Sequence, residues 1–299
     1  MLRRTITSLV AAYKMDESRH ELFVEGAGDR ILLEWLARDA INPDMRILEV
    51  DKYVEVNVND GGSKGRLLFV AAALQDQTTR ARFFIDADYD LLLGRSLPSN
   101  VWTTDRKDLE SYLAEISVMK KAIYLGLERD VYNPREVLSN VILMCRDVGL
   151  LRIISQRDCM DLPFQRTPAA KYVRKKRDKI IFEFNSFLKA LLQNASISLR
   201  KLSSIEAAYS LIKVEFKEVD DLRIIHGKDF LGISEAYVCK LGLEANQFAR
   251  MLWSAFDESI RERAPNLHKV LRFIEDPNTQ LIGEDRSQDT NYCLQFVIE

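Results

Sequence analysis

Residues 21–29, ELFVEGAGD, join a short apolar run to a carboxylate, a glycine and a second acidic residue. Residues 21–26 predict a β-strand that turns sharply just after Glu25, because a glycine follows the carboxylate. Residues 29–40, DRILLEWLARDA, have apolar side chains at helical spacing, and Asp29 is placed to cap that helix. A strand that passes through a tight turn into a helix is typical of the βαβ units of α/β proteins.

The same alternation continues to about residue 113. Short β-branched or aromatic runs predict strands, and apolar residues at helical spacing predict helices between them. One or two further strands are expected over residues 46–58, and one each over residues 80–86 and 101–104. The further helices are expected over residues 63–74 and from residue 108. Residues 1–113 are therefore expected to form a mainly parallel sheet flanked by helices, with an N-terminal helix over residues 1–18.

Beyond residue 113 the pattern is helical almost throughout. Asn133-Pro134 is a good helix start, with Asn as cap and Pro at the first helical position, and Gly149 is the expected stop. Later helices are expected over residues 178–194, 200–216, 229–241 and 244–275. The expected architecture is an α/β domain over residues 1–113 followed by a mostly α-helical domain over residues 114–299.

Composition narrows the class of protein. The 299 residues are 47% hydrophobic and 29% charged, with only 12 Gly and 7 Pro, which is typical of a globular chain. The longest unbroken apolar run, residues 67–74, is too short for a bilayer-spanning helix, and the N-terminus has too short an apolar stretch for a secretory signal. We therefore expect a soluble cytoplasmic protein with no membrane contact.

The cysteines argue against a structural metal or a disulfide framework. Cys145, Cys159, Cys239 and Cys293 form no C-x-x-C pair and have no nearby histidine cluster. Buried free thiols in a reducing compartment are the expectation.

Positive charge is concentrated between Arg152 and Lys179, where nine basic residues stand against three aspartates, a balance of +6. The densest part, KYVRKKRDK, contains an aromatic ring, so it predicts a surface that follows nucleic-acid phosphates. A solvated helix face is the alternative interpretation. The residues expected to contact nucleic acid are Lys171, Tyr172, Arg174, Lys175, Lys176 and Arg177.

Carboxylates follow two of the expected strands. Glu25 ends the first, and Asp86 and Asp88 end the apolar strand in FFIDADYD, where their side chains leave the same face if the strand conformation persists. Ligands of open parallel sheets bind at the carboxyl ends of the strands, so we expect these acids to converge. A cation would offset their repulsion, and oxygen ligands favour Mg²⁺ or Mn²⁺. Each motif alone is common as a turn or helix cap.

The paired motifs resemble the Toprim domain, the metal-binding module of topoisomerases, bacterial primases and OLD-family nucleases. Its marks are a strand-end Glu followed by Gly and a D-x-D after a later strand, which Glu25, Asp86 and Asp88 match. Asp29 matches the second acid of the E-G-x-x-D that OLD-type nucleases commonly carry.

Further motifs follow the order seen in stand-alone OLD-like Toprim proteins, above all in the Toprim effectors of PARIS-type anti-phage defence systems. These motifs are Gly61-Gly62-Ser63 before a helix, TDRKDLESYL at residues 104–113 and HGKD at residues 226–229. One departure is Tyr89-Asp90 after Asp88, where many Toprim domains have x-Gly. Asp90 is then either a supplementary ligand or a solvated side chain.

The resemblance implies a metal-dependent nuclease that hydrolyses phosphodiester bonds with catalytic residues Glu25, Asp86, Asp88, Glu110 and Lys228. Glu25 would be a ligand or a general base. Lys228 would offset charge on the phosphate or be an ordinary loop lysine, and His226 is expected to pack or cap rather than catalyse. Glu110 would serve a second metal or orient water, or be a helix-surface carboxylate. The expected metal ligands are Glu25, Asp86, Asp88, Asp29 and Glu110.

The resemblance also implies partners. The substrate would be RNA, and transfer RNA in particular, and the chain would be released from an AriA-like ATPase sensor subunit to act as a homodimer. The helical domain would serve substrate binding, dimerisation and partner contact. No G-x-x-x-x-G-K-[ST] occurs, so ATP hydrolysis belongs to a separate chain. Two alternatives remain: a non-catalytic Toprim-like module of an ATPase complex, and a DNA-directed OLD-like nuclease.

Overall fold

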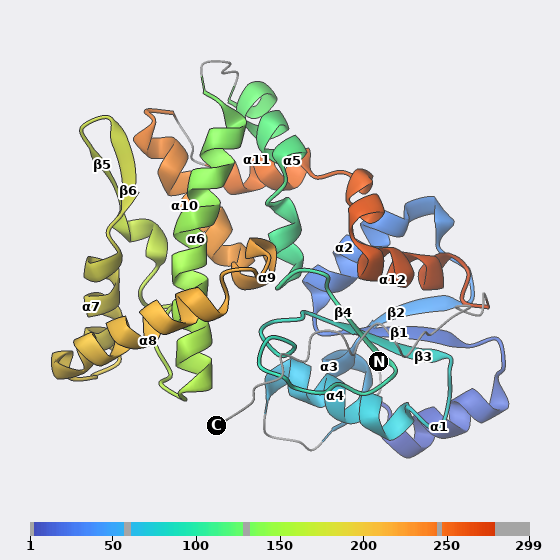
Figure 1. The fold of residues 1–299 in the computed structure, drawn as a ribbon. Helices are drawn as coiled ribbons and strands as arrows, with labels where there is room; N and C mark the ends of the chain where they lie inside the picture. Colours follow the sequence, from blue (N-terminus) through green and yellow to red (C-terminus); the bar gives the residue numbers. More distant parts are fainter. Residues whose placement is uncertain (1–2, 57–60, 128–131, 244–246, 279–299) are drawn as a thin grey trace.

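A parallel β-sheet flanked by helices forms one side of the molecule in the computed structural model, and a group of helices forms the other (Figure 1). The structure describes residues 3–56, 61–127, 132–243 and 247–278. The sheet has the order β2-β1-β3-β4, and every neighbouring pair is parallel. Its strands are β1 (His20–Val24), β2 (Met45–Glu49), β3 (Ala81–Ile85) and β4 (Val101–Thr103). The predicted α/β class and mainly parallel sheet are confirmed.

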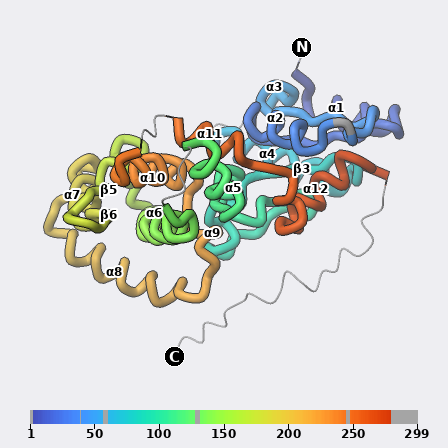
Figure 2. The backbone as a smooth tube through the Cα atoms, turned by 90° about the horizontal axis from the view of Figure 1, so that it is seen from above, coloured from blue at the N-terminus to red at the C-terminus, as the bar shows by residue number. Residues whose placement is uncertain are grey.

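Alternate side chains of the strands bury the two faces of this sheet. Phe23 and Phe83 stack at a centroid distance of 5.1 Å in one apolar cluster, beneath α1 (Ile6–Met15) and α4 (Gly62–Leu74). On the opposite face, Val24 and Phe84 belong to a second cluster that includes α2 (Ala27–Ala37) and α12 (Pro265–Glu275). The result is three layers, with helices above and below the sheet (Figures 1 and 2).

Helix α12 comes from the far end of the chain yet covers the sheet. Phe273 meets Trp102 of β4 edge to face at 5.4 Å between centroids. The carboxylate of Asp105, just beyond β4, accepts hydrogen bonds from the backbone N–H groups of Asn266 (2.8 Å) and Leu267 (3.1 Å). These bonds satisfy N–H groups of the first helical turn, which have no partner within the helix. The layer around the sheet is thus completed by residues outside 1–113.

Helix α6 (Pro134–Arg157) begins as the sequence predicts, since Asn133 accepts a hydrogen bond from the N–H of Arg135 and Pro134 occupies the first turn. The expected stop at Gly149 is wrong. The helix continues through this glycine. A Cβ at position 149 would lie 2.3 Å from the carbonyl oxygen of Ile224, so the contact with that segment requires glycine. Gly149 therefore permits close packing of another segment and does not end the helix.

The basic segment forms a β-hairpin instead of the start of a helix. Strands β5 (Val173–Lys176) and β6 (Lys179–Phe182) pair antiparallel across a two-residue turn in which Arg177 has a φ of 55°. The helix expected over residues 178–194 begins only at Phe184, as α7 (Phe184–Asn194). A tight turn between strands that carry Val173, Ile180 and Ile181 favours the extended conformation.

Two other expectations need correction. Of the one or two strands expected over residues 46–58, the first ends at Glu49 and gives way to α3 (Val50–Tyr53), because its neighbour β1 ends at Val24, which pairs with Glu49. In place of a second strand, the described residues form an isolated parallel bridge between Val54 and Arg4; residues 57–58 lie outside the described part. The helix expected over residues 244–275 is divided, from Phe248 onward, into α11 (Phe248–Ala255), a 3₁₀ turn (Glu258–Arg263) and α12. Residues 244–246 lie outside the described part.

The remaining elements follow the helical pattern more closely. The 3₁₀ turn η2 (Leu109–Leu113) begins at the predicted position, with Asp108 as its cap. The other helices are α5 (Ile116–Lys121), a π turn (Ala122–Gly126), α8 (Leu202–Glu215), α9 (Asp221–Ile224) and α10 (Gly227–Lys240), with short 3₁₀ turns at Arg38–Ala40, Ala169–Tyr172 and Leu199–Lys201.

Three cysteines are free thiols, as expected, but only Cys145 is buried, whereas Cys159 and Cys239 are exposed. Cys293 lies outside the described residues. Among the helices that the structure describes, none combines the length and the apolar character needed to span a bilayer.

Candidate metal-binding site at the carboxyl edge of the sheet

The site lies where the strand order reverses. From β1 the chain first forms β2 on one side of β1 and then β3 on the other, and ligands of open α/β sheets bind at the carboxyl ends of two strands related in this way, here β1 and β3. Glu25 follows β1 directly and Asp86 follows β3 directly. The two side chains therefore come from neighbouring strands, and the N–H of Asp86 donates to Oε1 of Glu25 at 3.3 Å.

Burial and crowding disfavour negative charge on these two side chains. Burial, followed by the nearby carboxylates of Asp29 and Asp88, raises the pKa of Glu25 to about 7, although Lys64 opposes the shift. Burial, followed by Asp108 and the other acids of the edge, raises the pKa of Asp86 to about 8. Carboxylates with these properties gain from a cation in contact with them.

Asp29 and Glu110 surround this pair. The helix expected from Asp29 begins earlier, at Ala27, so Gly26 and not Asp29 is its N-cap residue; Asp29 lies in the first turn and accepts a hydrogen bond from the N–H of Gly26 at 2.9 Å. Burial raises the pKa of Asp29, and burial followed by the charge of Asp108 raises that of Glu110. The structure thus brings Asp29 and Glu110 into the same electrostatic environment as Asp86.

Asp88 reaches the edge by a different route from the expected one. Strand β3 ends at Ile85, and Asp88 has a φ of 47°, so the extended conformation that would align it with Asp86 does not persist. Its Oδ2 lies 2.6 Å from Nζ of Lys64, and its Oδ1 lies 2.8 Å from Nζ of Lys107. Burial opposes its ionisation, but Lys107 and Lys64 outweigh burial and lower the pKa of Asp88.

Asp90 is buried, with 6% of its surface exposed, so the solvated interpretation is wrong. Its two carboxylate oxygens each meet a cation at 2.8 Å, Nζ of Lys64 on one side and a guanidinium nitrogen of Arg95 on the other.

The loop after β4 attaches helix α10 to the site. Both carboxylate oxygens of Asp108 accept from the N–H of Gly227, at 3.1 and 3.0 Å, and one also caps Ser111. Gly227 packs so closely that a Cβ would lie 2.3 Å from Cβ of Glu110. This contact positions Lys228, whose charge opposes the rise that burial causes in the pKa of Asp29 and Glu110.

His226 caps α10, since its Nδ1 accepts the N–H of Lys228 at 3.1 Å. Burial, followed by the charge of Lys107, lowers its pKa to about 4, so its ring is neutral near pH 7. The expectation that His226 caps rather than catalyses agrees with this geometry.

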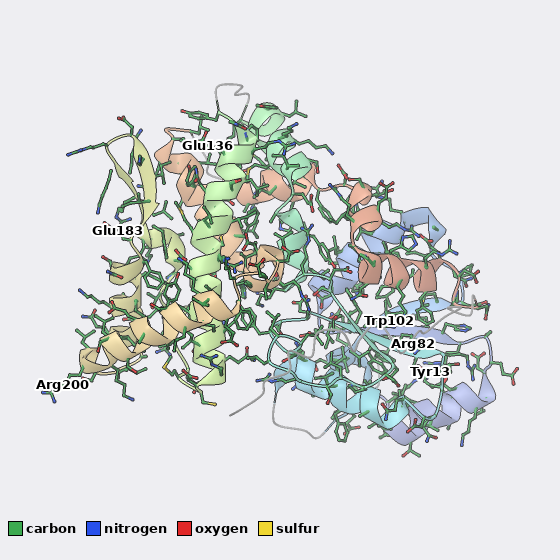
Figure 3. The ribbon with its side chains drawn as sticks, in the orientation of Figure 1. Tyr13, Arg82, Trp102, Glu136, Glu183 and Arg200 are labelled. Carbon is green, nitrogen blue, oxygen red and sulfur yellow. The ribbon has the colours of Figure 1, made fainter. Side chains whose placement is uncertain are left out.

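The basic residues lie elsewhere. Lys171, Arg174, Lys175, Lys176 and Arg177 are exposed, but the hairpin stands on the opposite side of α6 from the sheet (Figures 1 and 2). Glu183, labelled in Figure 3 where the hairpin meets α7, pairs with Lys176 at 3.0 Å. Tyr172 packs edge-on against Phe187 at 5.3 Å between centroids, so its ring is not a free stacking surface. The structure does not bring this segment to the acidic edge.

Three residues of the site escaped the sequence analysis: Lys64, Lys107 and Asp108. Lys107 and Asp108 stand inside TDRKDLESYL, and Lys64 follows the Gly-Gly-Ser turn at the start of α4. Their signal was present, since charged residues just beyond a strand or at a helix start lie at the carboxyl edge of such a sheet.

The donor chemistry fits a hard divalent cation. As the side chains stand, no three His, Cys, Asp or Glu residues in the described ranges are arranged to hold a metal ion. Glu25 and Asp86 nevertheless supply oxygen donors, the type that Mg²⁺ and Mn²⁺ prefer, and in the described structure no ion pair offsets either charge.

Comparison with known proteins adds no family assignment, since no protein-family model matches the chain and no curated protein is significantly similar to it.

Proposed function

We propose that this chain is a Mg²⁺- or Mn²⁺-dependent Toprim nuclease of the OLD-like type that hydrolyses phosphodiester bonds of RNA, transfer RNA in particular. In this proposal it is the toxic effector of a PARIS-like anti-phage defence system, similar to AriB. It acts in the cytoplasm as a homodimer after release from an AriA-like ATPase sensor subunit.

One observation carries the proposal. Glu25 and Asp86, which match the strand-end acids of the Toprim pattern, stand on adjacent parallel strands at the topological switch point and contact each other through the N–H of Asp86. Ligands of open α/β sheets bind in this crevice. Two half-buried carboxylates with raised pKa values at that point support a cation-dependent reaction.

The chain's own residues have separable roles. Glu25 and Asp86 would hold the cation, with Asp29, Asp88 and Glu110 around them. A bound divalent cation supplies Lewis-acid polarisation of a phosphoryl oxygen and lowers the pKa of water. Lys228, held at the edge through the bonds between Gly227 and Asp108, would face the phosphate and offset the charge that grows on it.

The exposed hairpin would bind the substrate backbone away from the reacting bond. Its lysines and arginines can neutralise phosphates, so binding should weaken steeply with salt. Because the hairpin and the acidic edge lie on opposite sides of α6, one substrate would have to be long enough to reach both, or a second copy would supply the hairpin. Transfer RNA is large and folded, which suits either arrangement.

The test incubates purified protein with transfer RNA in Mg²⁺ or in EDTA and resolves the products on a gel. Cleavage is expected in Mg²⁺ only, and Glu25→Gln and Asp86→Asn should each lower the rate by about 100-fold or more. Glu17→Gln, an exposed acid far from the edge, is the matched control and should cleave normally. Folding of both site variants should persist, because each substitution removes charge repulsion.

The alternatives appear as distinct outcomes. Cleavage of DNA but not RNA would support the DNA-directed OLD-like nuclease. A non-catalytic module predicts intact nucleic acid in every condition, together with toxicity on expression in cells that does not change in Glu25→Gln. Toxicity that disappears in Glu25→Gln while purified protein is inactive alone would instead indicate that the activating state requires the partner.

A further inference from the structure

The acidic edge divides into two halves with different counter-charges. Glu25 and Asp86 have no ion pair in the described structure, and their recorded polar contacts are to backbone N–H groups, of Asp86 and Leu109 respectively. Asp88 and Asp90, by contrast, each have two cationic partners. The pair Glu25 and Asp86 therefore lacks a cationic partner, whereas the charges of Asp88 and Asp90 are already balanced by lysine and arginine side chains.

Lys64 is the cation shared within the second half. Its Nζ lies 2.8 Å from the backbone oxygen of Asp86, 2.6 Å from Oδ2 of Asp88 and 2.8 Å from Oδ2 of Asp90. The ammonium donates hydrogen bonds to the first two of these oxygens and forms an ion pair with the third, so oxygens face it from three residues. The nitrogen thus occupies an oxygen-lined position of the type that a small metal ion would otherwise occupy.

Lys107 closes the other side of Asp88. Its side chain is 5% exposed, and its Nζ lies 2.8 Å from Oδ1 of Asp88 and 5.2 Å from the centre of the Tyr89 ring. Both carboxylate oxygens of Asp88 therefore carry an ammonium group. A metal ion at Asp88 would therefore share these oxygens with two ammonium groups, whose positive charges repel it.

The start of α4 holds Lys64 in this place. Gly61 and Gly62 have φ values of 90° and 61°, a left-handed backbone that residues with a Cβ rarely adopt, and they turn the chain toward β3. Asp51 then fixes the turn, since its carboxylate accepts from the hydroxyl of Ser63 and pairs with Arg66. Lys64 lies between these two anchored residues.

We propose that the Lys64 ammonium is a resident substitute for a second divalent cation, so that the site binds one divalent ion, at Glu25 and Asp86, and not two. This inference rests on the proposed function. Two-metal phosphodiester sites hold their ions about 3.5–4 Å apart. Lys64 contacts the main chain of Asp86 itself, so its charge occupies the space beside the first ion and repels another.

The test counts bound ions directly. Mn²⁺ binding to the full chain is measured by equilibrium dialysis and by the electron paramagnetic resonance signal of free Mn²⁺, for the wild type, Lys64→Met and Lys52→Met. Lys64→Met removes the ammonium and keeps a chain of similar length. Lys52→Met is the matched control, because the ion pair of Lys52 is with Glu49 at the end of β2, at 2.8 Å, and not with Asp86, Asp88 or Asp90.

We expect one Mn²⁺ per wild-type and Lys52→Met chain and two per Lys64→Met chain. Two ions on the wild type, or one ion still on a folded Lys64→Met chain, would overturn the inference and leave the proposed function intact. No ion on the wild type would overturn the metal-dependent function and the inference with it.

Asp88→Asn decides the question if Lys64→Met does not fold. With Lys64 as the resident cation, Asp88 is not a ligand of the bound ion, so Asp88→Asn should keep one Mn²⁺ with little change in affinity. Glu25→Gln should weaken that ion by roughly 10–100-fold. An equal loss in Asp88→Asn would show that Asp88 holds the metal and would contradict the proposal.

Discussion

At the scale of single residues, the carboxylates of the edge differ in how their charge is balanced. Asp88 and Asp90 form ion pairs with lysine and arginine, whereas Glu25 and Asp86 gain stability by keeping a proton. Protons and a metal ion therefore compete for the same carboxylate oxygens of Glu25 and Asp86. The pH at which the protein is handled should set how strongly it responds to Mg²⁺.

The first prediction concerns stability as a function of pH. The folded pKa values of Glu25 and Asp86, about 7 and about 8, lie above the ordinary values of these side chains. At pH values between the ordinary and the folded pKa, the folded state therefore binds more protons than the unfolded state. Stability in EDTA should be greater at pH 6 than at pH 8.5 and should fall as pH rises through the folded pKa values. Thermal unfolding at the two pH values measures this difference.

Mg²⁺ should raise the melting temperature more at pH 8.5 than at pH 6, because protons compete less for the ligands at the higher pH. In Glu25→Gln the side chain at position 25 is uncharged at both pH values, so this variant should lose less stability between pH 6 and pH 8.5 in EDTA than the wild type. His226, with its lowered pKa, changes charge only at lower pH and does not reverse the trend. Equal pH dependence in the wild type and Glu25→Gln would contradict the assignment of Glu25.

At the scale of elements, the docking of α10 depends on a glycine. A Cβ at Gly227 would lie 2.3 Å from Cβ of Glu110 and 2.6 Å from Oδ1 of Asp108. We predict that Gly227→Ala lowers the free energy of unfolding by about 1–3 kcal/mol, because backbone and side chain must both shift. The shift would also move Lys228, so if the proposed nuclease function is right, cleavage of transfer RNA should fall by more than the loss of folded protein explains.

Gly232→Ala on the same helix is the matched control. The nearest atom to a Cβ at Gly232 is 3.6 Å away, an ordinary contact. Alanine stabilises a helix interior by about 1 kcal/mol relative to glycine, so Gly232→Ala should be neutral or stabilising. Urea unfolding of both variants gives the comparison, and equal effects would show that the α10 contact is not close-packed.

The sequence predicts the two acids of the site, Glu25 and Asp86, but not the lysine beside them. The meeting of Glu25 and Asp86 follows from a general rule, since parallel strands end at one edge. Lys64 does not follow from such a rule, because its place depends on two left-handed glycines and an anchoring aspartate. Gly149 misled for a related reason: its value lies in contact with Ile224, which is remote in sequence.

The hairpin shows the limit of periodicity. Residues 173–182, VRKKRDKIIF, form a short segment in which a run of charged residues is followed by three apolar residues. This pattern fits either the first turns of a helix or two short strands. The two-residue turn at Arg177 joins two strands and requires a positive φ. No glycine stands at this position, so the sequence does not indicate the turn. Its charge was recognised, but its distance from the acidic edge depends on the packing of α6 and α10.

At the scale of the whole molecule, nucleic-acid binding and metal binding should be separable. We predict that the triple variant Lys175→Ala, Lys176→Ala and Arg177→Ala weakens transfer RNA binding and reduces the dependence of log K on log salt by about 2, since each phosphate contact to a single strand contributes about 0.7. Mn²⁺ binding should not change. Fluorescence anisotropy at several salt concentrations measures the slope.

A control variant removes the same charge from another exposed region. Arg200→Ala, Lys201→Ala and Lys217→Ala alter the ends of α8, and Figure 3 places Arg200 at its far tip. This variant should keep most of the wild-type slope. If both triple variants lose the same slope, RNA is attracted by overall charge and the hairpin is not a specific contact.

The position of α12 has a consequence for how the chain matures. Phe273 and its neighbours shield one apolar surface of the sheet, yet they are synthesised long after the strands. A nascent polypeptide that ends before Pro265 lacks the part of this cover that α12 supplies and keeps only the part from α2. One that ends before Gly227 also lacks Lys228, so translation adds both features only after the four strands have been made.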